Sequence, residues 1–210
     1  MSTLILCMMA GVIHAQEKDD FQFGIRMGAQ FSKLKGEGNS PNTTFEAKHS
    51  IALIGPAFGF IFEIPVNAYF EIRPELNFSS QGQRFKNGDW VYSKWMGYVQ
   101  VPVLLRGQYG NDKVRGFLQV GPQIGYGTFI LDRFRNGSDI ISKTSKSFKD
   151  SPFKPFDAGI AIGVGAEFPA AKGMEVEARY YGGFTDINDS PITTFKTRNQ
   201  SVHLTVAFKF

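Results

Sequence analysis

Apolar and polar residues alternate along most of the chain after residue 20. From Phe21 to Ser32 every second residue is apolar, and the residues between are polar or glycine. Because side chains of a strand point alternately to its two faces, a period of two predicts a strand. The same pattern ends the chain at Phe210, and further segments lie between. The predicted strands are 21–32, 50–64, 69–81, 95–109, 116–128, 156–168, 174–184 and 201–210.

The connections between these strands alternate in length. Long connections are expected at 33–49, 82–94, 129–153 and 185–198, and short ones at 65–67, 110–114 and 169–173. Tight turns at one end and large loops at the other are typical of up-and-down barrels in the bacterial outer membrane, where the short turns face the periplasm. An even number of strands places both ends of the barrel on the periplasmic side.

A bilayer contains no water to bind backbone polar groups, so every backbone N–H and C=O must find a partner within the protein. A closed sheet meets this requirement. The longest apolar stretch is shorter than the roughly 20 residues that a spanning helix needs. The chain is therefore predicted to be all-β, an eight-stranded antiparallel up-and-down transmembrane β-barrel. The rival is a soluble barrel that binds a lipid inside and has the opposite polarity. The loop alternation and the terminal Phe210 favour the membrane.

Four prolines interrupt this simple picture. Pro56, Pro74, Pro102 and Pro122 lie inside predicted strands, and a closed barrel has no free edge on which to place them. We expect β-bulges near them, or strands that project beyond their neighbours near the rims.

The first fifteen residues, MSTLILCMMAGVIHA, are apolar and end at Ala15 before the polar sequence QEKDD. This pattern indicates a signal peptide at 1–15 and a mature barrel at 16–210, exported through the Sec pathway, although a positively charged start is missing. The alternative is a buried N-terminal strand or helix. Cys7 lies in this segment, so the mature chain would contain no thiol, disulfide or cysteine-ligated metal.

Several segments resemble the PorT-like outer-membrane β-barrel family of Bacteroidota, and together they cover most of the mature chain. They are FEIRPELNFSSQG (70–82), YVQVPVLLRGQY (98–109), FLQVGPQIGYG (117–127), FDAGIAIGVGAEF (156–168) and VEARYYGGFTDI (176–187). The resemblance implies the barrel fold and an outer-membrane location. It also implies that most of the awkward prolines belong to the architecture. Type IX secretion, for which the family is named, does not carry over as a function.

Composition agrees with a membrane barrel. The chain has 23 Gly and 21 Phe among 210 residues, and its mean hydropathy of −0.16 is too low for a bundle of membrane helices. The net charge of +4 arises from basic residues spread along the chain without a cluster. No nucleic-acid partner is therefore expected.

Many charged residues share the polar faces of the predicted strands. The lumen of an eight-stranded barrel is just wide enough to be filled by side chains. We therefore expect a buried, structural ionic network without an open pore, and an excess of acidic over basic groups in it. The predicted members are Arg26, Glu63, Glu71, Arg73, Glu75, Arg106, Asp157, Glu167, Glu175, Glu177, Arg179 and Lys209.

Candidate chemistry is sparse. His203 is expected in the lumen, where it could pair with a carboxylate in a barrel enzyme that modifies lipids, but a hydrogen-bonded structural histidine is the simpler interpretation. His49 begins the second strand, and His14 leaves with the signal peptide. No catalytic residue, metal site or cofactor is predicted, and GVG at 163–165 is expected to serve packing.

The external loops are mildly basic. They are expected to contact lipopolysaccharide phosphates or an envelope protein partner, with solvated loop charge as the alternative. The function predicted is a structural or ligand-binding role through these loops. The alternatives are an accessory component of a transport or type IX secretion system and, less favoured, a lipid-modifying enzyme. The candidate contacts are Arg84, Lys86, Arg133, Arg135, Lys143, Lys146 and Lys149.

Overall fold

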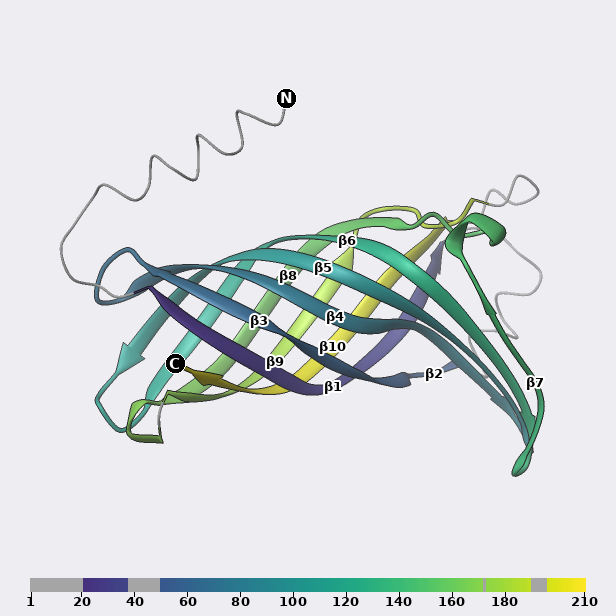
Figure 1. Ribbon diagram of the computed structural model, residues 1–210, viewed down its shortest axis with the longest axis horizontal. Helices are drawn as coiled ribbons and strands as arrows, with labels where there is room; N and C mark the ends of the chain where they lie inside the picture. Colours follow the sequence, from purple (N-terminus) through teal and green to yellow (C-terminus); the bar gives the residue numbers. More distant parts are fainter. Residues whose placement is uncertain (1–20, 38–49, 172, 190–195) are drawn as a thin grey trace.

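The computed structural model describes residues 21–37, 50–171, 173–189 and 196–210 (Figure 1). The predicted signal peptide and His49 lie outside these residues. The strands are β1 (Gln22–Glu37), β2 (Ser50–Ile51), β3 (Leu53–Pro65), β4 (Phe70–Asn87), β5 (Trp90–Gly110), β6 (Arg115–Asn136), β7 (Asp139–Lys146), β8 (Phe156–Phe168), β9 (Met174–Gly183) and β10 (Lys196–Lys209). Two short 3₁₀ helices are η1 (Phe148–Asp150) and η2 (Pro169–Ala171).

Eight strands close into a ring, so the predicted eight-stranded antiparallel barrel is confirmed. Neighbours around the ring are β1, β3, β4, β5, β6, β8, β9 and β10, and β10 pairs with β1 to close it. The start of β1 and the C-terminus lie at the same end of the barrel (Figure 1), where the Phe210 N–H donates to the Phe23 carbonyl oxygen at 2.8 Å. The short turns after β3, β5 and β8 lie at this end as well, which is the periplasmic end of an outer-membrane barrel.

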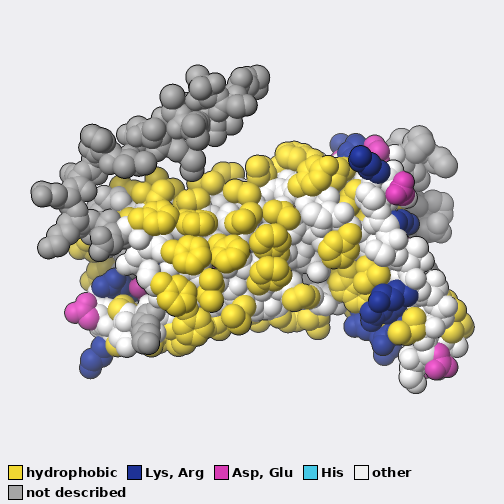
Figure 2. Space-filling view, in the orientation of Figure 1, with side chains coloured by type: hydrophobic (Ala, Val, Ile, Leu, Met, Phe, Trp, Pro, Cys, Tyr) yellow, Lys and Arg dark blue, Asp and Glu magenta, His cyan; other side chains and the backbone are white. Residues whose placement is uncertain are grey.

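The two faces of the barrel wall differ in polarity. Apolar side chains such as Met27, Phe58 and Leu118 point outward and are more than half exposed. Polar and charged side chains such as Gln30 and Arg73 point inward and are fully buried. Figure 2 shows the outer surface covered by hydrophobic side chains along its middle, with charged side chains at the two ends. This is the polarity that a lipid-embedded barrel requires.

At the external end, the structure corrects the predicted loops at 82–94 and 129–153. Strands β4, β5 and β6 continue beyond the barrel to tight turns at 88–89 and 137–138, and β7 returns along β6. We call residues 82–95 of β4–β5 and 131–145 of β6–β7 the external sheet. Its outward residues become charged where the membrane ends, so the apolar alternation stops although the backbone pairing continues.

The prolines do not lie at bulges, so the first of the two expected arrangements was wrong. Register shifts occur instead at Gly97/Tyr98 and Phe134/Arg135. Around Pro74 the β3–β4 pairing passes from Ile61↔Glu75 to Ile64↔Ile72 without a shift in register. A similar gap follows Pro102 in the β5–β6 pairing. The strands thus accommodate these prolines by leaving nearby backbone positions unpaired. No extra residue is inserted, as it would be in a β-bulge.

The external end of the lumen is covered by apolar side chains. Phe148 of η1 packs edge-on against Tyr98, with ring centroids 5.6 Å apart, and joins a buried cluster with Met96, Ile130 and Ile187.

Among the described residues, no helix is long and apolar enough to cross a bilayer.

Candidate functional site

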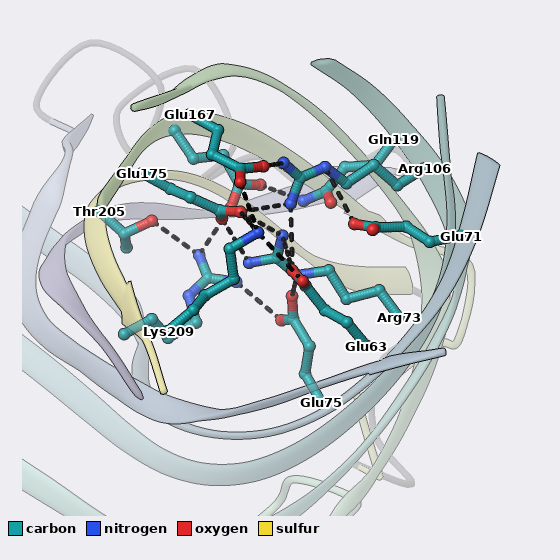
Figure 3. A network of polar contacts seen from close by, with 12 residues as sticks. Glu63, Glu71, Arg73, Glu75, Arg106, Gln119, Glu167, Glu175, Thr205 and Lys209 are labelled. Atoms are coloured by element: carbon teal, nitrogen blue, oxygen red, sulfur yellow. Dashed lines mark hydrogen bonds and ion pairs between the residues drawn. The ribbon is translucent and has the colours of Figure 1, made fainter. Parts of the chain in front are cut away.

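A dense ionic network fills the periplasmic half of the lumen (Figure 3). Its side chains come from seven of the eight barrel strands because inward positions on neighbouring strands meet in so narrow a barrel. All members are at most 8% exposed at the side chain. They are the cations Arg26, Arg73, Arg106, Arg179 and Lys209 and the glutamates Glu63, Glu71, Glu75, Glu167, Glu175 and Glu177.

The layer nearest the periplasm is organised by Arg106. Its guanidinium pairs with Glu167 at 2.7 Å and with Glu71 at 3.1 Å, and it also contacts Glu175. Lys209, the penultimate residue of the chain, reaches Glu63 and Glu167 at 3.0 Å each. The Lys209 side chain thereby links β10 to β3 and β8.

Arg73 connects this layer to the next one. Its Nη2 donates to Glu175 at 2.7 Å, and its Nε lies 3.1 Å from Glu75. Glu75 also accepts from Arg26 at 2.7 Å and from Arg179 at 2.6 Å. Each Arg and Glu in this layer thus has more than one oppositely charged partner, which is the arrangement that offsets the cost of burying charge.

Asp157 lies outside this network, whereas His203 lies beside it, opposite Arg179 in the β9–β10 pairing. Asp157 accepts from Asn199 at 2.8 Å, and among the described residues it forms no ion pair, so the structure does not bring it into the predicted network. His203 Nε2 lies 3.0 Å from Ser201 Oγ. Both residues point into the lumen and are at most 6% exposed, whereas a substrate lipid would meet the outer wall.

A second concentration of charge lies on the outward face of the external sheet. Cross-strand pairing sets Arg84, Ser93, Arg133 and Lys143 in one row, and Lys86, Val91, Arg135 and Ile140 in the row beyond it. Residues opposite one another in neighbouring strands share a face. The five cations in these rows form what we call the outer cation patch: Arg84, Lys86, Arg133, Arg135 and Lys143.

No acidic side chain in the described part of the chain compensates the outer cation patch. Among the described residues, none of its members forms an ion pair, and the Nε atoms of Arg84 and Arg133 are buried without a hydrogen-bond partner. The Arg133 guanidinium lies over the ring of Trp95, 5.1 Å from its centroid. Figure 2 shows basic side chains gathered on the outer surface near this end.

Lys146 and Lys149, the remaining predicted contacts, lie elsewhere. Lys146 Nζ is 3.3 Å from Asp132, which also accepts from Lys94 and Tyr92 at 2.7 Å each. Partial burial alone would raise the pKa of Asp132, but the hydrogen bonds from Lys94 and Tyr92 outweigh it and hold the pKa below its ordinary value. Lys149 is exposed in η1.

A repeated motif in the sequence points to the outer cation patch. Residues 84–89 read RFKNGD and residues 133–138 read RFRNGS. The two copies lie on β4 and β6 with β5 between them, so each contributes two cations to the same face. Among the described residues, no group of three or more His, Cys, Asp or Glu side chains is placed to hold a metal ion.

The ring of strands, the apolar outer wall and the charged lumen define a small integral β-barrel of the bacterial outer membrane. The chain belongs to the family described as outer membrane protein beta-barrel domain, whose model matches residues 14–189. No curated protein matches the chain in sequence.

Solved structures with a similar fold include three small barrels. Ail, the attachment invasion locus protein of Yersinia pestis, was crystallised with the heparin analogue sucrose octasulfate; it is 14% identical over 91% of this chain and 100% of its own, with a TM-score of 0.45. OprG from Pseudomonas aeruginosa is 12% identical over 90% and 96%, with a TM-score of 0.48. The outer membrane enzyme PagL is 11% identical over 89% and 98%, with a TM-score of 0.46.

Proposed function

We propose that this protein is a closed, non-enzymatic barrel that binds the phosphate groups of lipopolysaccharide through the outer cation patch. The observation that carries the proposal is the set of five cations on one outward sheet face without a described acidic partner. Arg and Lys side chains are the usual ligands of phosphate, and Arg can engage it with two parallel hydrogen bonds.

The height of the patch supports this ligand. Phe129, on the outward face of β6, is 46% exposed, and Trp95 and Leu131 form the next outward row. Tryptophan is enriched where the membrane meets water. The row of Arg84 and Arg133 follows directly, about 7 Å further along the strands. The patch therefore lies at the level where lipid phosphates begin.

The spacing of the cations supports it too. Arg84 and Arg133 lie two strands apart, which is about 9–10 Å, and the row of Lys86 and Arg135 lies about 7 Å beyond them. Four cations at these separations can surround a phosphate group from two sides. Ser93 and Val91, at the centre of the two rows, are only 2% and 8% exposed under these long side chains.

The test is retention of lipopolysaccharide by the folded barrel after gentle detergent extraction, measured by native mass spectrometry. In the variant Arg84→Gln, Lys86→Gln, Arg133→Gln, Arg135→Gln, binding should weaken by roughly 10³-fold, because each cation near an anionic lipid surface contributes about 1 kcal/mol. Binding by the wild type should also weaken as salt concentration rises.

A control variant changes the net charge equally: Lys113→Gln, Arg115→Gln, Lys149→Gln, Lys154→Gln. All four residues are described and lie off the patch. The control should retain lipopolysaccharide like the wild type, and both variants should keep the heat-modifiable gel migration of a folded barrel. Equal loss of lipid in both variants, or undiminished binding in the first, would contradict the proposal.

We propose further that the chain is PorT-like and that residues 1–15 direct it through the Sec pathway. The resemblance of the segments at 70–82 and 156–168 supports the first statement, and the apolar stretch ending at Ala15 supports the second. A mature N-terminus at Gln16 in protein purified from the outer membrane would be the expected result.

A further inference from the structure

The opposite face of the external sheet carries an aromatic platform. The repeated motif places Phe85 and Phe134 on the inward, concave side, and β5 adds Tyr92 between them and Trp90 beyond them. Trp90 stacks on Phe134 with centroids 5.1 Å apart and planes 17° from parallel. Phe85 stacks on Tyr92 at 6.3 Å and 21°. These four side chains support one another across three strands.

The outermost row of this face combines an exposed ring with polar groups. Asn87, Trp90, Asn136 and Asp139 lie opposite one another on β4, β5, β6 and β7. Trp90 is 46% exposed, and the three polar residues are exposed as well. Among the described residues, no hydrogen bond or ion pair engages the side chains of Asn87, Asn136 or Asp139.

The turns that carry the row are held in place. Gly88 and Gly137 are the first residues of these two-residue turns and adopt φ of 58° and 55°, the left-handed conformation that favours glycine. The two turns are joined by a hydrogen bond from Gly137 N–H to the Asp89 carbonyl oxygen at 2.9 Å. The row is therefore presented by a rigid element at the outer tip of the molecule, where little reordering is needed on binding.

Trp90 is too far out to anchor the protein in the membrane interface. It lies five residues beyond Trp95 on the same strand, which is about 17 Å along β5. An exposed ring stacked on other aromatic side chains and flanked by unpaired polar groups marks a ligand surface.

We propose that this tryptophan row binds a neutral oligosaccharide from outside the cell. A sugar ring offers a face of C–H bonds that packs on an indole and a rim of hydroxyl groups that pair with amides and carboxylates. The row holds two amides and a carboxylate but no cation, which favours a neutral sugar over a phosphate. The row faces away from the lipid side of the sheet, so the glycan arrives from the medium and not from the leaflet.

The experiment uses the natural pair of tryptophans. The chain contains two tryptophans, Trp90 and Trp95, so the full-length variant Trp95→Phe leaves Trp90 as the sole tryptophan. The folded barrel in detergent is titrated with laminarihexaose, mannohexaose and chitohexaose, each up to millimolar concentrations. At least one should give a saturable blue shift of Trp90 emission. The absence of a saturable change with all three would overturn the proposal.

Variants identify the surface independently of fluorescence, with calorimetry as the readout. Asn87→Ala combined with Asn136→Ala should weaken binding at least tenfold, and Trp90→Ala should abolish it, while Trp95→Ala on the opposite face should leave it intact. The four-glutamine variant of the outer cation patch should bind the sugar normally, which separates this proposal from the one on lipopolysaccharide. Binding unaffected by Trp90→Ala, or stronger binding of lipopolysaccharide core oligosaccharide than of all three probes, would contradict it.

Discussion

Arg73 shows why a charged residue can lie inside a membrane protein. Its side chain has no exposed surface, yet its three nitrogens reach Glu63, Glu75 and Glu175 at 2.7–3.1 Å. An ionised group buried without partners would cost several kcal/mol. The lumen therefore holds arginine only because glutamates from β3, β4 and β9 converge on it.

Arg73→Met should destabilise the barrel by about 3–5 kcal/mol, because removing one partner of a buried ionic network leaves the others uncompensated. Unfolding in urea, followed by the loss of heat-modifiable migration, measures the change. Arg115→Met is the control. Arg115 is partly exposed, and its ion pair with the exposed Asp112 is long, at 3.6 Å. Its effect should stay within about 0.5 kcal/mol, and equal effects of the two substitutions would argue against a stabilising network.

At this scale the sequence predicts which side chains point inward but not which ones meet. Alternation along β4 places Glu71, Arg73 and Glu75 on one face. Their partners lie far away in the chain: Arg73 and Glu175 are 102 residues apart. Asp157 also occupies an inward position of its strand, yet it lies outside the network. Its height along the barrel axis depends on how the strands are staggered, and the apolar–polar alternation carries no information about stagger.

The external sheet is the element that the sequence predicts least well. Its strands lack the apolar outward face on which the alternation argument rests, because they have left the lipid. β7, with the sequence DIISKTSK, is exposed along nearly its whole length and has no buried face to produce a pattern. The signal present in the sequence is the repeat RFKNGD and RFRNGS, whose Gly-Asp and Gly-Ser pairs form the two hairpin turns.

Asp132 on β6 joins two side chains of β5 and one of β7, so Asp132→Asn should loosen the external sheet. Faster hydrogen exchange is expected in β7 and the outer part of β6, with the barrel strands unchanged. Because the pKa of Asp132 is lowered in the folded protein, its contribution is present above the ordinary aspartate value of about 4 and is lost as pH falls through the lower folded value.

The wild type should therefore approach the exchange rates of Asp132→Asn only below about pH 4, after correction for intrinsic rates. Exchange in β7 that is equal in the two proteins at neutral pH would show that Asp132 does not hold the sheet.

In the whole molecule, the two ends of the lumen are filled by different kinds of side chain, as far as the described residues show. The ionic network blocks the periplasmic half, and the cluster of Met96, Tyr98, Ile130, Phe148 and Ile187 covers the external end. Both surfaces proposed to bind ligands, the outer cation patch and the tryptophan row, lie outside the barrel. In this proposal the barrel fixes the external sheet at a defined height above the membrane.

Single-channel recording in planar bilayers tests most directly whether the lumen is closed and the function lies outside it. Folded wild-type protein, with insertion verified by its heat-modifiable migration after recovery from the membrane, should produce no discrete conductance steps. Reproducible steps of uniform size would contradict a closed lumen and would favour a role in transport.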